Sequence, residues 1–265
     1  MPSLICPVCG KRLERKSGSL VCEKGHSYDV AKEGYVNLLR SGRDGDGIGD
    51  DKISCRSRRD FLNKGYYSVL RDALKEEIGK RPAGSSVLDI CCGEGYYTSS
   101  FAQGKYDVFG FDISKEAVRL ASKRGNASYF VSNMTSIPFE DGSFDVATEL
   151  FAPFCESEFA RILKDGGSLF TVVPAAKHLW GLKTLLYDNP YENDEKLPET
   201  SLFEVKNLRT VTSTVTLETN EDIKAVFRMT PYFFRTSLSD KQKLETVPSL
   251  TTEIGFVIAE MVKKY

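Results

Sequence analysis

Apolar positions change their spacing several times along the chain. Short apolar runs predict strands at residues 87–90, 106–112, 128–131, 143–151 and 168–173. Helical spacing appears at residues 55–80, 114–124 and 156–163, with Ser114 as the N-cap of the second helix and Glu116 in its first turn. Because strands alternate with helices between residues 87 and 173, the pattern predicts an α/β fold with a parallel, Rossmann-like sheet.

The last third of the chain has a different pattern. A helix is expected at residues 178–187, followed by a polar loop at 190–198. Two β-rich runs at residues 203–217 and 250–262 flank a helical stretch at 221–229 and predict final antiparallel strands. Glycine and aspartate alternate at residues 41–51 without apolar periodicity, which is typical of a linker. We therefore expect three parts, at residues 1–40, 41–80 and 81–265.

Composition narrows the class of protein. The 265 residues are 41% hydrophobic and 28% charged, as in soluble globular proteins. The sequence contains no run of about 18 apolar residues, which is the length needed to span a membrane. Without a basic-then-apolar start, a cytoplasmic location is expected. The net charge of −1 excludes a globally basic nucleic-acid binder, although residues 1–40 carry seven Lys/Arg against four Asp/Glu.

A glycine turn follows the first predicted strand. Residues 87–98 read Val-Leu-Asp-Ile-Cys-Cys-Gly-Glu-Gly-Tyr-Tyr-Thr, so the run ends in glycines and then in residues that can open a helix. Such a turn presents backbone N–H groups to a nucleotide-like ligand. Asp89 beside it would repel a pyrophosphate but suits the sulfonium and ammonium of S-adenosylmethionine. We expect this cofactor here, with Cys91 and Cys92 packed in the turn.

Two further positions extend this prediction. Asp112 ends the second strand at about the spacing at which a carboxylate binds both hydroxyls of a ribose. Asn133 starts a loop that can lie along the adenine. The alternative is an ordinary Rossmann-like fold whose strand-end acids only cap helices. The predicted cofactor-binding residues are Asp89, Cys91, Gly93, Gly95, Tyr96, Tyr97, Asp112, Ile113, Asn133 and Met134.

Three of the seven cysteines have regular spacing near the N-terminus. Cys6 and Cys9 form one C-x2-C pair, and Cys22 with His26 forms a second pair after twelve residues. Four such ligands can close a tetrahedron around zinc, with Gly10 and Gly25 supplying the unusual backbone angles. A reduced cysteine pair with a surface histidine is the alternative. Because so short a segment cannot build a core, we expect the metal to supply its folding energy.

Basic and aromatic residues suggest how an RNA could bind. The zinc segment would present cations to a polyanion, although the charges by themselves favour a solvated face. Arg56, Arg58 and Arg59 cluster at the start of the 55–80 helix and could touch RNA phosphate, with a solvated helix end as an equal alternative. Phe151 and Phe154 follow the fourth strand at the edge where an acceptor meets the cofactor, so they could stack a target base or pack in the core. The zinc-segment cations are Lys11, Arg12, Arg15, Lys16 and Lys24.

These motifs together resemble the zinc-containing ribosomal-RNA guanine-N1 methyltransferases. The resemblance runs from the Cys6 pair through Cys22 and His26 to Leu39, continues at residues 58–67 and in the cofactor stretch, and includes His178-Leu179 in outline. It covers roughly the first two thirds of the chain. Cys91 stands where a glycine is often seen, and Asn133 where an aspartate is common in the wider superfamily.

The resemblance implies methyl transfer from S-adenosylmethionine to N1 of a guanine in a hairpin loop of 23S rRNA. It also implies the sheet of a class I methyltransferase with an N-terminal zinc ribbon, and a homodimer as the assembly. Guanine N1 must lose its proton, and the candidate acceptors are Glu149 and His178, each with a structural role as the alternative. Two other functions stay open: a methyltransferase of a small molecule or protein with a structural zinc, and a non-catalytic RNA-binding factor.

Overall fold

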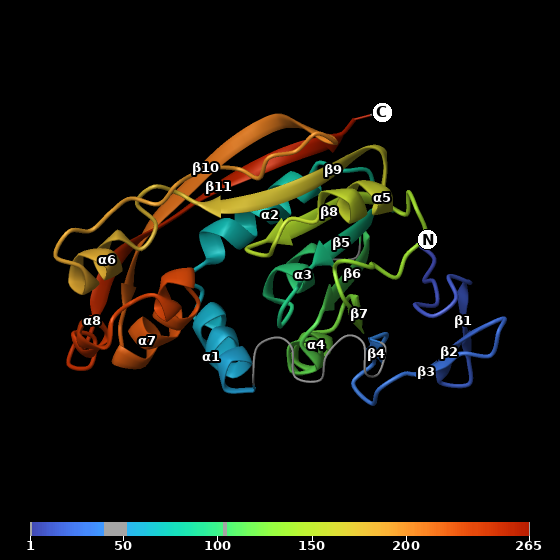
Figure 1. Ribbon diagram of the computed structural model, residues 1–265, viewed down its shortest axis with the longest axis horizontal. Helices are drawn as coiled ribbons and strands as arrows, with labels where there is room; N and C mark the ends of the chain where they lie inside the picture. The colour runs from blue at the N-terminus through green and yellow to red at the C-terminus, as the bar shows by residue number, and fades with distance from the viewer. Residues whose placement is uncertain (1, 40–51, 103–104, 265) are drawn as a thin grey trace.

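Two β-sheets organise the computed structural model, which describes residues 2–39, 52–102 and 105–264 (Figure 1). The N-terminal sheet is antiparallel in the order β1-β2-β3, and the central sheet has the order β10-β11-β9-β8-β5-β6-β7-β4. The strands are β1 (Leu13–Lys16), β2 (Ser19–Cys22), β3 (Ser27–Asp29), β4 (Val36–Asn37), β5 (Ser86–Ile90), β6 (Asp107–Asp112), β7 (Ser128–Val131), β8 (Phe144–Leu150), β9 (Leu163–Pro174), β10 (Phe203–Leu217) and β11 (Leu250–Lys263).

Helices connect most of the central strands. They are α1 (Lys52–Asn63), α2 (Ser68–Gly79), α3 (Tyr96–Phe101), α4 (Lys115–Ser122), α5 (Glu156–Ile162), α6 (Trp180–Leu186), α7 (Asn220–Arg228), the 3-10 helix η1 (Pro231–Phe234) and α8 (Leu238–Gln242). Ser114 caps α4 as predicted, because its side chain accepts the Ala117 N–H. No helix in the described part of the chain is long and apolar enough to cross a membrane.

The strand order confirms the predicted parallel sheet and its antiparallel extension. Pairing is parallel from β4 through β9, and β11 then pairs antiparallel with β9 and β10. From β5 the chain first builds β6 and β7 on one side and then returns to build β8 and β9 on the other. The strand order therefore reverses between β5 and β8, where the carboxyl ends of open α/β sheets bind ligands.

The expectation of one helical stretch over residues 55–80 is wrong. The chain forms α1 and α2, separated by a turn at Gly65, whose φ of +82° places it in the left-handed region. The apolar spacing stays in step across this turn, so periodicity alone does not reveal the break. β9 also begins earlier than expected, at Leu163 rather than residue 168.

The N-terminal segment packs on the central sheet. β4 pairs with β7, Leu4 forms a bridge with Phe139, and Cys6, Leu13 and other ribbon residues share one apolar cluster with the sheet. Burial against the sheet therefore contributes to the stability of this segment, and the expectation that the metal supplies its folding energy stays a prediction. The predicted division at residues 40 and 80 stays a prediction, and the predicted linker at residues 41–51 lies outside the described residues.

Zinc ribbon and cofactor cavity

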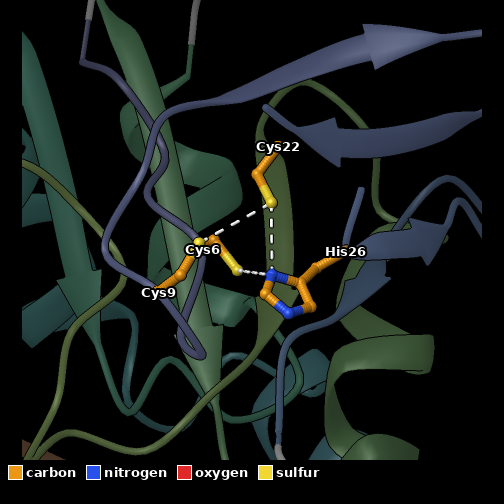
Figure 2. A group of neighbouring side chains, drawn as sticks. All are labelled: Cys6, Cys9, Cys22 and His26. Atoms are coloured by element: carbon orange, nitrogen blue, oxygen red, sulfur yellow. Dashed lines mark hydrogen bonds between the residues drawn. The ribbon is translucent and has the colours of Figure 1, made fainter. Parts of the chain in front are cut away.

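The four predicted zinc ligands converge in the N-terminal sheet (Figure 2). Their ligand atoms all lie within 4.8 Å of one another. Cys9 Sγ lies 3.7 Å from Cys22 Sγ, and His26 Nδ1 lies 3.5 Å from Cys6 Sγ and 3.3 Å from Cys22 Sγ. A tetrahedral zinc with ordinary bond lengths requires edges of about 3.8 Å between sulfurs and about 3.6 Å between sulfur and nitrogen. The residues therefore fit zinc, bound through Nδ1 of the histidine.

Backbone geometry and a neighbouring hydroxyl support this cluster. Gly10 and Gly25 have φ of +70° and +81°, as predicted for the two turns that carry the ligands. Tyr28 Oη lies 3.3 Å from Cys6 Sγ and can donate to the thiolate of a loaded site. All four positions around the metal are taken by protein, which is typical of a structural zinc site.

The predicted cofactor turn joins β5 to α3 and is built for close approach. A Cβ on Gly95 would lie 2.9 Å from the Ala121 Cβ and 3.0 Å from the Tyr129 hydroxyl, so only glycine fits there. Cys91 has a φ of +55°, the region that glycine adopts most easily. This conformation explains why a glycine is favoured at the position, and it shows that the chain accepts backbone strain beside the ligand.

Asp89 is buried near the end of β5. The hydroxyl of Thr98 donates to its Oδ2, and the hydroxyl of Thr148, directly opposite in β8, donates to Oδ1 at 2.6 Å. Burial raises the pKa of this carboxyl to about 6, against the effect of the two threonine hydroxyls. A carboxylate held in this way favours a cation in front of it.

The second predicted acid organises the turn itself. Asp112 Oδ2 accepts the Gly93 N–H at 3.0 Å, and Oδ1 accepts the Ser114 N–H at 2.8 Å. The carboxylate therefore ties the end of β6 to the glycine turn. Asn133 Oδ1 accepts from the N–H and hydroxyl of Thr135, so its amide nitrogen is the group suited to an adenine edge.

A cavity of about 1250 Å³ opens off the carboxyl ends of β5, β8 and β9. Five predicted cofactor residues line it: Asp89, Cys91, Gly93, Tyr96 and Tyr97. Gly95, Asp112, Ile113, Asn133 and Met134 are not among the described residues that line this cavity. Sulfur contact between Cys91 and Met134 at 3.7 Å nevertheless links the two groups. The charge pattern of the turn, with a buried carboxylate and no basic side chain among these predicted residues, fits the cationic S-adenosylmethionine.

Both predicted proton acceptors also line the cavity. Glu149 is 3% exposed, and its two oxygens accept from the Thr171 hydroxyl at 2.6 Å and the Ala152 N–H at 2.7 Å. Burial raises the pKa of Glu149 despite these donors. Phe151 is 50% exposed at the same wall, whereas Phe154 packs edge-on against Phe159 and Phe203.

His178 has a partner on each ring nitrogen. Its Nδ1 accepts the Gly255 N–H at 3.2 Å, so the neutral ring carries its proton on Nε2, which lies 3.3 Å from Tyr67 Oη. Burial lowers the pKa of His178 to about 4. The imidazole is thus neutral at pH 7, and it joins the turn between α1 and α2 to β11.

Several residues that build this site were not predicted from the sequence. Thr98, Thr148 and Thr171 orient the two carboxylates, and their place on neighbouring elements gives no local signal. Asn193 lies in the loop predicted at residues 190–198, and its amide nitrogen donates to the carbonyls of Ala175, Ala176 and His178.

Comparison with known proteins adds family-level information. A family model described as "RlmA, N-terminal" matches residues 4–41, and a methyltransferase-domain model matches residues 87–167. A Bacillus subtilis protein assigned as a 23S rRNA (guanine-N1-)-methyltransferase is 34% identical over 197 residues, which cover 70% of this chain and 69% of that protein. The chain belongs to the 23S rRNA (guanine-N1-)-methyltransferase family.

A second curated relative agrees with this assignment. The 23S rRNA (guanine(748)-N1)-methyltransferase of Streptomyces fradiae is 35% identical over 184 residues, covering 66% of this methyltransferase and 65% of that protein. Among solved structures, a phosphoethanolamine N-methyltransferase of Haemonchus contortus with S-adenosylmethionine has a TM-score of 0.46 and 15% identity, covering 86% of this chain and 61% of that one. The family establishes S-adenosylmethionine and zinc as the groups that this methyltransferase uses.

Proposed function

We propose that this methyltransferase transfers a methyl group from S-adenosylmethionine to N1 of a guanine in a hairpin loop of 23S rRNA. One observation carries the proposal: a single cavity brings the cofactor turn at Asp89 and Gly93 together with a buried carboxylate, Glu149, and a half-exposed ring, Phe151. A base that enters this cavity meets the methyl donor, a proton acceptor and a stacking surface.

The chemistry of guanine N1 explains why a carboxylate is needed. When bound, S-adenosylmethionine supplies an electrophilic methyl group on a positively charged sulfur. Guanine N1 carries a proton that must leave as its electron pair forms the new N–C bond and the S–C bond breaks. Glu149 would accept this proton and later release it to solvent. The released proton carries away the positive charge that the sulfonium loses when it becomes a neutral thioether. Holding both reactants in line can supply about 7–11 kcal/mol.

We assign Glu149 and His178 different roles. Glu149 keeps acceptor capacity, since each of its oxygens receives one hydrogen bond and a carboxylate can accept about four. The one acceptor nitrogen of the neutral His178 ring, Nδ1, is already occupied by the Gly255 N–H, and a pKa lowered to about 4 by burial makes the imidazole a weak base, so a positioning role fits it better than proton transfer. It would hold Tyr67 and, through ring contact, Phe256 behind the cavity.

Phe151 is suited to stack the target base. Its ring is exposed at the cavity wall and rests on Phe256 with a centroid distance of 5.6 Å, while its backbone has a φ of +64°. A strained backbone that keeps an aromatic ring exposed beside a ligand site is consistent with binding rather than core packing. Because the Watson–Crick edge must reach the cavity, the guanine has to be unpaired or flipped out.

The zinc ribbon is suited to hold the RNA backbone. All five of its predicted cations are exposed, although Lys11 pairs with Glu23 at 3.1 Å. Phosphate contacts by such residues position RNA without reading its sequence. The hairpin loop and a homodimer remain proposals that rest on the family resemblance.

The test is a methylation assay with radiolabelled cofactor and unmodified large-subunit rRNA, followed by digestion to nucleosides. Label in 1-methylguanosine is the expected result. Label in another nucleoside would overturn the guanine assignment, and absence of RNA label despite cofactor binding would favour a small-molecule or protein substrate. Deleting an otherwise methylated hairpin from the RNA then tests the hairpin assignment.

A further inference from the structure

The mouth of the cavity carries an exposed aromatic ring far from the cofactor turn in sequence. Phe233 and Phe234 of η1 line the cavity together with Arg228 at the end of α7. Phe234 is 82% exposed, more than any other large apolar side chain in the described ranges. A large apolar group that stays in water beside a cavity marks a binding surface when its neighbours hold it in place.

The neighbours of Phe234 do hold it in place. Its ring meets Phe233 edge-on, with centroids 5.2 Å apart and an interplanar angle of 80°. Phe233 in turn meets Phe227, again at 5.2 Å, and Phe227 is 3% exposed in the core. Lys241 Nζ lies 4.5 Å from the centroid of the Phe233 ring and covers it. The exposed ring therefore rests on an aromatic chain that continues into the core.

Two arginines lie close to this ring in the sequence, and one of them, Arg228, also lines the cavity. Arg228 and Arg235 are exposed on either side of it in sequence, and neither forms an ion pair with any residue that the structure describes. Three acidic residues of the same region form ion pairs with lysines: Asp222 with Lys64, Glu245 with Lys224 and Asp240 with Lys243. Glu221 lies at the opposite end of α7 from Arg228. We call Arg228, Phe234 and Arg235 the rim cluster.

The size of the cavity leaves room for more than the target base. Pockets for single small ligands usually measure about 300–1,000 Å³, whereas this cavity measures about 1250 Å³, and the cofactor-turn residues form only part of its lining. Aromatic rings flanked by cations are the usual platform for unpaired nucleotides, because every base has a face that stacks and every nucleotide has a phosphate.

We propose that Phe234 stacks on the base of an unpaired nucleotide next to the target guanine, with Arg228 and Arg235 on its phosphates. This inference rests on the proposed function and adds a second base-binding position to it. In Figure 1 the helices around η1 lie at the opposite end of the molecule from the zinc ribbon, so the RNA would be held at both ends with its target between them.

The first test compares three variants of the full-length protein with unmodified 23S rRNA. Phe234→Ala should raise KM for RNA about tenfold or more, while kcat at saturating RNA and the Kd for S-adenosylmethionine stay within twofold. Phe234→Trp should keep the wild-type KM, because tryptophan also stacks. Leu238→Ala, at a side chain that is 79% exposed in the neighbouring α8, is the matched control and should leave KM unchanged. A wild-type KM for Phe234→Ala would overturn the inference.

The second test locates the nucleotide. A target hairpin is prepared with one abasic site at a time on either side of the guanine, and its Kd is measured with each protein. One abasic position should weaken binding to the wild type but not to Phe234→Ala; equal effects on both proteins at every position would overturn the inference. A change of Phe234→Ala from dimer to monomer in sedimentation would instead assign the ring to a contact between chains. If the proposed function itself is wrong, the wild-type protein will methylate no guanine. This outcome differs from failure of the stacking inference, in which the wild type methylates guanine but Phe234 does not matter.

Discussion

At the scale of single residues, two buried carboxylates at one sheet edge differ in their surroundings and therefore in their roles. Asp89 is held by two threonine hydroxyls, whereas Glu149 is held by one threonine hydroxyl and one backbone N–H. Both lose hydration on burial, which favours their neutral forms. A cation in the cavity would favour the charged form of Asp89 instead. At Glu149 the preference for the neutral form would help the carboxylate to take up the proton that guanine N1 loses.

Asp89→Asn should weaken cofactor binding and also stabilise the free protein. Since the folded-state pKa is about 6 against an ordinary 3.8, the contribution of Asp89 to stability is present below pH 3.8 and is lost as the pH rises through about 6. The loss is on the order of 3 kcal/mol. Above pH 6 the variant should therefore melt at a higher temperature than the wild type without ligand.

The cofactor affinity of the wild type should follow the same titration. Its Kd for S-adenosylmethionine should fall as the pH rises from about 4 to 6, and Asp89→Asn should remove this dependence. Calorimetric titration at several pH values checks both results. A variant that binds with wild-type affinity at pH 7 would contradict the role of Asp89.

Glu149→Gln should lower kcat by about 100-fold or more, because glutamine cannot accept the N1 proton. The Kd for S-adenosylmethionine should change little, since the amide can keep the contacts with Thr171 and Ala152. Asp145→Asn, at the other end of β8, is the control and should keep activity within about twofold. The wild-type rate should fall at acidic pH, where Glu149 is protonated; wild-type kcat in the glutamine variant would exclude Glu149 as the acceptor.

At the scale of elements, the zinc ribbon and the loop at residues 188–200 are both fastened to the central sheet. The ribbon uses apolar packing and the β4–β7 pairing, whereas the loop uses polar contacts. Lys183 in α6 is fully buried, and its Nζ donates to the Tyr191 carbonyl at 2.9 Å and to Asn193 Oδ1 at 2.7 Å. Burial lowers the pKa of Lys183, so its charge depends on these partners.

Cys22→Ser should remove zinc and weaken the ribbon without unfolding the cofactor site. We expect metal content near zero, a melting temperature lower by about 10 °C and loss of RNA methylation, because one ligand is missing from a four-ligand site. Elemental analysis, thermal unfolding and the methylation assay measure these effects. Cys155→Ser, outside the cluster, should retain zinc and activity; normal zinc content in Cys22→Ser would contradict the ligand assignment.

Asn193→Ala should destabilise the protein by about 2 kcal/mol, because it removes the side-chain donor to three backbone carbonyls and one of the two hydrogen-bond acceptors of the buried Lys183. Combining it with Lys183→Met should reduce this loss, since the double variant no longer buries a cation that has lost an acceptor. Urea unfolding of the single and double variants measures the coupling. Asn207→Ala, at an exposed position of β10, serves as the control. Additive effects of Asn193→Ala and Lys183→Met would show that the two side chains do not depend on each other.

At the scale of the whole molecule, the ribbon and the central sheet share apolar side chains. Ribbon residues such as Leu20 and Leu38 belong to the same cluster as Phe139 and Phe159 of the sheet side. Cooperative units follow shared cores, so the ribbon should not unfold as an independent domain.

Thermal unfolding of the zinc-loaded protein should therefore show one transition, and a chelator should shift that transition to lower temperature. Scanning calorimetry with far-UV circular dichroism checks this. Two transitions, with only the first sensitive to the chelator, would show that the ribbon folds by itself. A protein of residues 52–265 should melt lower than the full chain even with S-adenosylmethionine bound, because β7 and the Phe139 region lose their cover.

The sequence by itself determined the features that depend on local spacing. The four zinc ligands, the cofactor turn with Asp89 and Asp112, the succession of strands and helices along the chain and the cap at Ser114 all follow from short-range patterns, because turn geometry and amphipathic faces need only neighbouring residues. The carboxylate at Glu149 was predicted at its strand end for the same reason.

Only the tertiary structure decided which distant groups meet. It placed β4 beside β7, broke the predicted helix at Gly65, engaged both nitrogens of His178 through Gly255 and Tyr67, and brought Phe234 to the cavity that begins at Asp89. These contacts join segments far apart in the chain. Their formation depends on how the two faces of the sheet are covered, and no local pattern of residues contains that information.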